Sequence, residues 1–248
     1  MTSTLLEPLA PAAARPKPAP AFHVAALIPA YREERFIADV VRRTRAQLDA
    51  VLVIDDGSDD RTGELARAAG AEVITHKVNL GKGAAIQTGF RKLATRGFDF
   101  VLVLDADGQH LPEEIPRFLE AARAGGSKML VGNRMRDTAD MPWNRRWTNQ
   151  FMSALISGLC GQPVCDTQCG FRMIHRDLIP RLVGERTVGF QYETEMLILT
   201  SWRGETISAV PISTVYGEET SSIHPVRDAL RFFALMGRYW LKRLRGGR

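Results

Sequence analysis

The chain has 248 residues, of which 45% are hydrophobic and 25% charged, and this composition excludes a fibrous or wholly disordered protein. Its formal net charge of +5 arises in the tail, because residues 224–248 hold seven Arg or Lys and one Asp. The rest of the chain is close to neutral, which disfavours nucleic-acid binding. Three cysteines at spacings that match no zinc motif indicate structural thiols in a reducing compartment.

Residues 1–21 hold five prolines and six alanines, with almost no aromatic or β-branched residues. Such a segment buries too little surface to order itself, so we expect a disordered leader. It has no basic region followed by an apolar stretch, so it is not predicted to be a secretory signal. We therefore expect a folded domain over 22–216 and a distinct tail over 217–248.

From residue 22 onward, apolar runs alternate with amphipathic stretches. The pattern predicts strands at 24–28, 51–54, 72–74 and 101–104, and helices at 33–47, 60–69 and 83–94. This alternation is typical of an α/β protein with a mostly parallel sheet and right-handed crossovers. Each strand is followed by a polar or glycine-containing loop, so we expect these loops to form one cleft at the carboxyl edge of the sheet.

The loop after the fourth strand carries the densest polar cluster, Leu104-Asp-Ala-Asp-Gly-Gln-His110. Asp105 and Asp107 are two residues apart and point to one side if the chain stays extended. Paired carboxylates need a neutralising cation, and hard oxygen ligands suit Mg²⁺ or Mn²⁺. Gln109 would continue that side as a neutral third ligand. The alternative is a polar turn with Asp107-Gly108 at its corner.

Two other loops carry charges that suit a nucleotide. Asp55 and Asp56 follow the second strand and offer acceptors to a base or ribose, while Lys82 follows the third strand and would offset phosphate charge. The alternatives are that Asp59 or Asp60 caps the next helix, and that Lys82 is an ordinary solvated lysine.

Five motifs in this order, IPAYREERFI, VIDDGSDDRT, NLGKGAA, LDADGQH and DTQCGFR, resemble the family 2 glycosyltransferases of the GT-A fold. More narrowly they resemble the dolichol-phosphate mannosyltransferase and polyprenyl-phosphate glycosyltransferase branch, over residues 24–216. The resemblance implies a Rossmann-like central sheet flanked by helices. It also implies metal-dependent, inverting transfer of a hexose from a nucleotide-sugar, of the GDP-mannose or UDP-glucose type, to a dolichyl or undecaprenyl phosphate. The QxxRW motif of processive members is absent, which favours one sugar per turnover.

The same resemblance assigns roles to individual residues. The nucleotide-sugar site would comprise Pro29, Tyr31, Glu33, Asp56, Lys82, Asp105, Ala106 and Asp107. The metal ligands would be Asp105, Asp107 and Gln109, binding Mg²⁺ or Mn²⁺. The acceptor phosphate would meet Arg134, Arg145 and Arg146, whose guanidinium groups offer paired donors. Asp107, Arg134 and Asp166 are the catalytic candidates.

Some of these assignments have alternatives. Asp166 is either a catalytic base or a residue that orients Arg172 or an acceptor group, because a phosphate monoester, with a second pKa of about 6, is already a nucleophile at neutral pH. Glu193 either binds a sugar hydroxyl or favours a helix N-terminus. Arg145 and Arg146 open a predicted helix that reaches residue 159, and their alternative role is a solvated helix start.

The tail is predicted to form an amphipathic helix. With about 100° per residue, its basic residues fall within about 60° of one another, and these are Arg227, Arg231, Arg238, Lys242 and Arg245. The opposite side holds Val226, Ala229, Leu230, Phe233, Met236, Trp240 and Leu244. Such a helix suits a membrane interface, and the alternative is packing on the domain or a partner. Ser221, Ser222 and His224 precede it, where related enzymes place an acceptor loop.

We therefore expect a peripheral enzyme on the cytoplasmic face of a membrane, and a membrane-protein partner or a homo-oligomer stays open. A second hypothesis is transfer to a soluble or protein acceptor, which predicts activity without lipid. A third is a non-catalytic adaptor that docks on membranes through its tail. Intact Asp105, Asp107 and Gln109 argue against the adaptor, which has no need of paired carboxylates.

Overall fold

The structure is a computed structural model that describes residues 22–136, 143–184, 189, 191–213 and 225–246. The leader, the expected acceptor loop with Ser221, Ser222 and His224, and the domain boundary at 216–217 lie outside these ranges. The elements are β1 (Val24–Ala30), α1 (Ile37–Arg45), β2 (Ala50–Asp55), α2 (Thr62–Ala68), β3 (Glu72–Thr75), α3 (Lys82–Ala94), β4 (Phe100–Val103), η1 (Pro112–Glu114), α4 (Ile115–Ala124), β5 (Met129–Asn133), η2 (Arg134–Arg136), α5 (Trp143–Cys160), β6 (Arg172–His175), α6 (Ile179–Leu182), α7 (Gln191–Ser201), β7 (Ile207–Pro211) and α8 (Pro225–Leu244).

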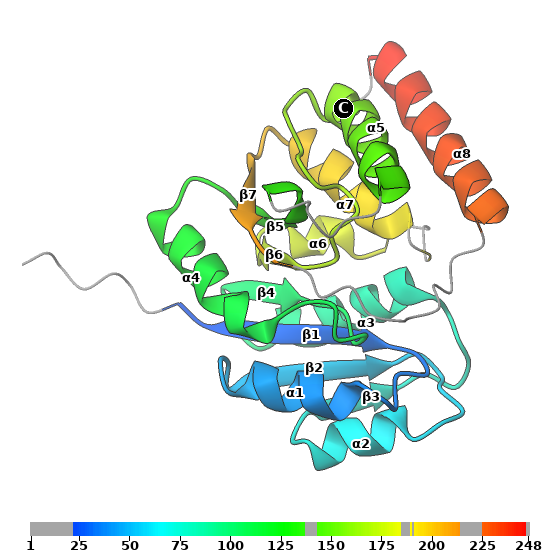
Figure 1. The fold of residues 1–248 in the computed structure, drawn as a ribbon. Helices are drawn as coiled ribbons and strands as arrows, with labels where there is room; N and C mark the ends of the chain where they lie inside the picture. The colour runs from blue at the N-terminus through cyan, green and yellow to red at the C-terminus, as the bar shows by residue number, and fades with distance from the viewer. Residues whose placement is uncertain (1–21, 137–142, 185–188, 190, 214–224, 247–248) are drawn as a thin grey trace, which may run out of the picture.

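In the described residues the strands form one seven-stranded sheet in the order β3-β2-β1-β4-β6-β5-β7 (Figure 1). β1 pairs in parallel with β2 and β4, and β2 pairs in parallel with β3. β6 runs antiparallel to both neighbours, while β5 and β7 are parallel. The mostly parallel sheet is therefore confirmed. The winding direction reverses between β1 and β4, which is the position where open α/β sheets bind ligands.

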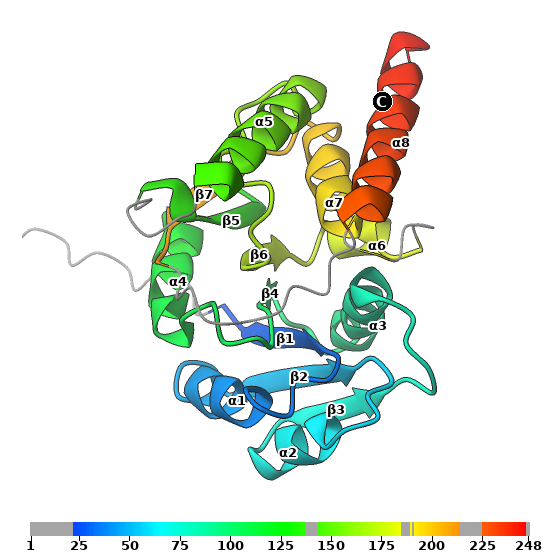
Figure 2. The ribbon, with the colours of Figure 1, turned by 45° about the vertical axis from the view of Figure 1, so that its right-hand side comes forward.

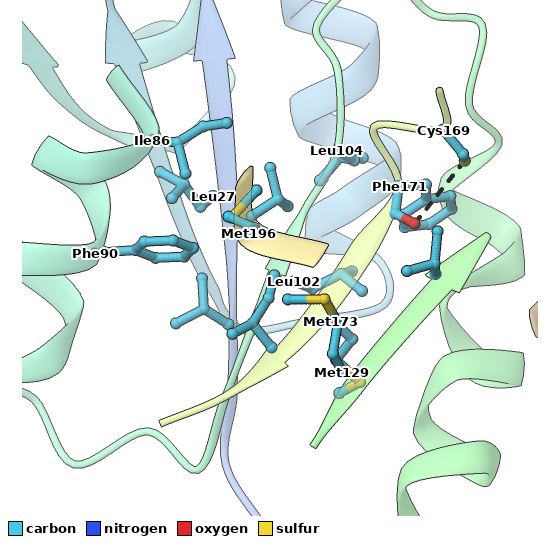
Figure 3. Close-up of a cluster of buried hydrophobic side chains, with 14 of the residues drawn as sticks. Leu27, Ile86, Phe90, Leu102, Leu104, Met129, Cys169, Phe171, Met173 and Met196 are labelled. Carbon is cyan, nitrogen blue, oxygen red and sulfur yellow. Dashed lines mark hydrogen bonds between the residues drawn. The ribbon is translucent and has the colours of Figure 1, made fainter. Parts of the chain in front are cut away.

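The buried strands explain this arrangement. β1 and β4 are buried along their whole length, as uninterrupted apolar runs covered by helices require. Figure 3 shows the core between them, where Leu27 of β1 and Leu102 of β4 lie with Phe90 of α3 and Met196 of α7. The core thus joins the two halves of the sheet and fixes the strand ends that carry the polar loops.

Two of the three cysteines are part of this interior. Cys160 and Cys169 are buried, and burial raises the pKa of Cys160 to about 11 and that of Cys169 to about 12. Thiols with such pKa values hold almost no thiolate at neutral pH, so these two cysteines are structural as expected. Cys165 is exposed.

The C-terminal helix α8 packs against α5 and α7 (Figure 2). Its buried side chains are Phe232, Leu235, Met236 and Tyr239. Among the described side chains of the apolar face expected from the sequence, only Met236 is buried, while Leu230, Phe233, Trp240 and Leu244 are exposed. The helix therefore has a second apolar stripe, which is largely exposed and approaches the domain where Trp240 lies near Gly158 of α5. No helix within the described ranges is long and apolar enough to cross a bilayer.

Candidate active site

The side chain of Lys82, the first residue of α3, is placed between two carboxylates. Its Nζ lies 2.6 Å from Asp105 Oδ1 and 3.1 Å from Glu193 Oε2. Asp105 follows β4 and Glu193 lies in the first turn of α7, so the cluster joins three distant segments. The side chain of Lys82 is only 18% exposed, and the interpretation of an ordinary solvated lysine is therefore wrong.

Burial and charge act in opposite directions on this cluster. Burial alone lowers the pKa of Lys82, but Asp105 and Glu193 raise it above its usual range. Burial raises the pKa of Asp105, but Lys82 and His110 lower it below its usual range. His110, which is buried, helps to lower the pKa of Asp105 because its Nε2 lies 3.6 Å from Asp105 Oδ2. Lys82 and Asp105 are therefore both charged at neutral pH and stabilise each other.

The segment 104–110 is a turn and not an extended strand. β4 ends at Val103, the Asp107 carboxylate accepts a hydrogen bond from the backbone N–H of Gln109 at 3.0 Å, and Gly108 has a φ of 75°. This is the polar turn with Asp107-Gly108 at its corner, so the assumption that extended backbone carries Asp105 and Asp107 to one side is wrong.

The donor atoms present suit a hard divalent cation. Asp107 and Gln109 offer oxygen ligands, which Mg²⁺ and Mn²⁺ prefer. Within the described part of the chain, no group of three or more His, Cys, Asp or Glu could hold a metal. A cation here would therefore take further ligands from water or from the donor. Asp105 could join them only if Lys82 moved away from its carboxylate.

The glycine of the DTQCGFR motif touches the same site. A Cβ atom on Gly170 would lie 2.5 Å from Asp105 Oδ2, closer than real contacts allow. Only glycine leaves room for the carboxylate to approach the backbone at this point. This contact brings the motifs around residues 105 and 170 together at one site.

Asp56 has a structural role in the loop before Lys82. It is buried, and it accepts hydrogen bonds from the backbone N–H groups of Leu80 at 3.0 Å and Gly81 at 2.7 Å. Its Oδ1 also lies 2.7 Å from Nδ1 of His76. The carboxylate is thus occupied in holding the loop that delivers Lys82, which disfavours the expected contact with a base or ribose, and that contact stays a prediction.

The remaining expected donor residues follow β1 and β4. Pro29 and Ala106 are buried, whereas Tyr31 is 39% exposed and accessible to a ligand. The backbone N–H of Glu33 donates to Thr62 Oγ1 at 2.8 Å, so the loop after β1 is tied to the start of α2. The predicted cap at Asp59 or Asp60 is wrong, because the N-cap of α2 is Arg61, without a side-chain cap hydrogen bond, and Asp60 instead accepts from the N–H of Thr62 at 3.0 Å.

On the acceptor side, Arg134 follows β5 and is held by Asp166. The Asp166 carboxylate accepts from Arg134 Nε at 2.7 Å, Nη2 at 2.9 Å and the backbone N–H at 3.1 Å, and from Asn149 Nδ2 at 2.8 Å. Asp166 is 1% exposed. Its oxygens are occupied by four donors, which makes it a positioning residue for Arg134 and disfavours a role as base.

Arg172 has a structural role, which the sequence alone could not distinguish from a role in the site. It is fully buried and donates to the backbone carbonyls of Cys169 at 2.8 Å, Thr167 at 2.9 Å and Glu193. It therefore ties the DTQCGFR loop to the start of α7. The expected alternative that Asp166 orients Arg172 is wrong. Of the other two acceptor candidates, Arg146 is exposed on α5, and the side chain of Arg145 lies outside the description.

The Asp166–Arg134 pair predicts a defined pH dependence of stability. Burial raises the pKa of Asp166, but the hydrogen bonds and charge of Arg134 and the bond from Asn149 bring it below its usual range. The stabilisation is therefore complete above the unfolded-state pKa of about 3.9, and is lost as the pH falls through the lower folded-state pKa.

Urea unfolding measured at a series of pH values tests this. We expect wild type to be more stable than Asp166→Asn near neutrality, and the difference to shrink below about pH 4 because asparagine does not titrate. Two stability curves that stay parallel down to the acid transition would contradict the pairing.

Comparison with known proteins places this site in a family. The model of "Glycosyl transferase family 2" matches residues 25–183. A UDP-N-acetylglucosamine–dolichyl-phosphate N-acetylglucosaminyltransferase of Methanococcus voltae is 30% identical over 215 residues, which cover 77% of this chain and 85% of that protein. An undecaprenyl-phosphate mannosyltransferase of Micrococcus luteus is 31% identical over 211 residues, covering 79% and 84%.

The fold also has a solved counterpart. The glucosyl-3-phosphoglycerate synthase of Mycobacterium tuberculosis, in complex with uridine diphosphate, superposes with a TM-score of 0.70 at 22% identity. The match covers 88% of this chain and 80% of that one. Other structures of the same enzyme contain Mn²⁺ or Mg²⁺ with the nucleotide. The fold is that of these transferases, and the chain belongs to glycosyl transferase family 2.

Proposed function

We propose that this glycosyltransferase moves one hexose from a nucleotide-sugar to a polyprenyl phosphate at a membrane surface, with inversion and with Mg²⁺ or Mn²⁺. The observation that carries the proposal is Arg134, whose guanidinium is fixed by the buried Asp166 in a two-point bond. A guanidinium oriented in advance suits a phosphate oxyanion. The two relatives named for dolichyl- and undecaprenyl-phosphate transfer support the same acceptor class.

On the donor side, the residues at the ends of β1 and β4 and at the start of α3 would bind the nucleotide-sugar. Asp107 and Gln109 would hold the divalent cation, and Lys82 would add its own charge near the diphosphate. When bound, the cation would take up negative charge on the departing nucleoside diphosphate. Tyr31, which is accessible after β1, offers a ring surface to the base.

On the acceptor side, the phosphate needs orientation more than deprotonation. A phosphate monoester is largely dianionic at neutral pH because its second pKa is about 6, so it can attack the sugar in a single displacement without a protein base. Arg134 would align it, and Asp166 would keep Arg134 in place. Arg145 and Arg146, at the start of α5, remain candidates for further contacts with the phosphate.

The exposed faces of α5 and α8 fit a lipid acceptor. Trp147 and Phe151 of α5 are 68% and 57% exposed. On α8 the exposed large apolar residues are Leu230, Phe233, Trp240, Leu241 and Leu244. The two helices meet where a Cβ on Gly158 of α5 would lie 3.8 Å from the ring of Trp240. We call this combined surface the α5–α8 face.

Basic residues of α8 accompany the α5–α8 face. Arg231 and Lys242 are exposed, and Arg238, also exposed, reaches across to Glu195 of α7 at 3.3 Å. Apolar side chains with Lys and Arg at their margin are typical of segments that bind the interface of an anionic membrane. A peripheral position on the cytoplasmic leaflet follows as part of the proposal.

The acceptor is tested by comparing three compounds with one labelled donor. We expect sugar transfer to a polyprenyl phosphate in detergent, and none to the matching polyprenol, which lacks the phosphate. 3-Phosphoglycerate, a water-soluble phosphate acceptor, should also fail. Transfer to 3-phosphoglycerate without transfer to lipid would replace the proposed acceptor by a soluble one. Donor binding without transfer to any of them would favour an adaptor.

The α5–α8 face predicts a defect in membrane binding. The double variant Trp147→Ser/Phe151→Ser is expected to partition at least about tenfold more weakly into anionic vesicles, since each buried aromatic side chain contributes about 1.5–3 kcal/mol. Vesicle co-sedimentation measures this. Val78→Ser is the matched control, because Val78 is 61% exposed in the loop after β3, away from both helices. Equal loss in the control, or no loss in the double variant, would contradict the assignment.

A further inference from the structure

The ammonium group of Lys82 lies between two carboxylates, which need a nearby cation even when no donor is bound. Asp105 and Glu193 approach each other from the end of β4 and the start of α7, and Lys82 bridges them at 2.6 Å and 3.1 Å. All three side chains are largely buried, with exposed fractions of 18%, 23% and 12% for Lys82, Asp105 and Glu193. Two carboxylates that are buried this close together need a positively charged group beside them.

One lysine does not satisfy this pair completely. A single ammonium balances one of the two carboxylates, so the three groups together keep one negative charge. Glu193 Oε1 is buried and has no hydrogen-bond partner among the residues that the structure describes. A buried acceptor without a partner is costly, so a bound group that donates to Glu193 Oε1 would stabilise the arrangement.

We propose that Lys82 is an internal counter-ion that gates the metal site. In the donor-free protein it offsets one of the two negative charges of Asp105 and Glu193 and so weakens the attraction of the site for a free divalent cation. When a nucleoside diphosphate arrives with its metal, the ammonium transfers its contacts to the diphosphate oxygens. Asp105 is then available to the cation. The inference rests on the proposed donor site, and it adds an order of events to that site.

The loop that carries Lys82 supports this role. Asp56 accepts the backbone N–H groups of Leu80 and Gly81, so the residues just before Lys82 are held at fixed points. Lys82 itself reaches its carboxylates through a flexible four-carbon stem, and this stem can carry the ammonium to a new partner without movement of the backbone. The N-terminus of α3, which Lys82 opens, also favours an anion.

The gate predicts how the metal and the nucleotide influence each other. Because a metal–nucleotide pair removes Lys82 from Asp105, each should strengthen the binding of the other, and linkage requires the effect to be equal in both directions. Without the ammonium, Mn²⁺ alone should bind well, and the nucleotide should add little.

Mn²⁺ binding to the full chain, followed by the electron paramagnetic resonance of free Mn²⁺, tests the gate in the absence of nucleotide. We expect the affinity for Mn²⁺ to rise from Glu193→Gln to wild type and from wild type to Lys82→Met, because each step makes the buried site one charge more negative. Lys82→Met should bind Mn²⁺ at least about tenfold more tightly than wild type. Lys82→Arg, which keeps the cation, should stay near wild type. Equal affinities of Lys82→Met and wild type would overturn the proposal.

The same measurement with saturating UDP or GDP tests the transfer of the ammonium. In wild type the nucleotide should tighten Mn²⁺ binding at least about tenfold more than it does in Lys82→Met. The same enhancement in both proteins would also refute the gate. If Lys82→Met fails to fold, the comparison of Glu193→Gln with wild type decides, and unchanged affinity there counts against the proposal. No arm uses an acceptor, so a wrong acceptor class leaves these results interpretable.

Discussion

Arg134→Ala is expected to lower the rate of sugar transfer by about 10²–10³-fold, the usual effect of removing one preorganised donor that stabilises charge in a transition state. The structure supplies the reason, since the guanidinium donates two hydrogen bonds to the Asp166 carboxylate, which also accepts from the backbone N–H of Arg134. The change also leaves a buried carboxylate without its partner, which costs about 3–5 kcal/mol of folding stability. Initial rates and urea unfolding measure the two effects separately.

Two variants distinguish positioning from folding. Arg134→Lys keeps the charge but loses the planar fork, and we expect most of the stability to return while most of the rate does not. Arg42→Ala is the matched control for a loss of charge, because Arg42 is exposed on α1 and belongs to neither the donor site nor the acceptor site. A variant Arg134→Ala that is stable and fully active would exclude Arg134 from the acceptor site.

Asp107→Ala is expected to abolish the dependence of transfer on Mn²⁺ and to lower the rate by about 10²-fold or more, because the charge on the leaving diphosphate then lacks its counter-ion. Its carboxylate accepts a hydrogen bond from the Gln109 N–H in the turn. Asp107 is partly exposed, so the variant should fold normally. Rates at saturating donor over a range of Mn²⁺ concentrations measure the effect.

Gln109→Ala should also lower the rate of transfer and its dependence on Mn²⁺, but by less than Asp107→Ala, since an amide oxygen is a weaker ligand than a carboxylate. The matched control is Glu120→Ala, which removes an exposed carboxylate from α4. If Asp107→Ala retained a steep response to Mn²⁺, the metal would have to be bound elsewhere.

The first four strands could be predicted because each is an apolar run separated from the next by an amphipathic helix. β6 could not be predicted, since it begins with Arg172, a charged side chain that is nevertheless fully buried. Its burial depends on three backbone carbonyls supplied by the loop before it and by α7. A strand of this kind is defined by tertiary contacts, which local pattern does not contain.

Within the site, the sequence indicates which residue types are present but not where their side chains point. Asp56 looks available to a ligand, yet its carboxylate turns toward the loop that ends at Lys82. The contact of Lys82 with Glu193 joins positions more than a hundred residues apart, and no motif spacing predicts it. Helical periodicity likewise shows that α8 is amphipathic but not which of its two apolar stripes packs on the domain.

The most direct test of the proposed function is the transfer of radiolabelled sugar from GDP-mannose or UDP-glucose to a polyprenyl phosphate in detergent, with Mn²⁺ or with EDTA. We expect labelled lipid with one of the two donors, in the presence of Mn²⁺ only. Labelled lipid that forms equally well in EDTA would contradict the metal site. Metal-dependent loss of sugar from the donor, with no labelled lipid, would contradict the acceptor.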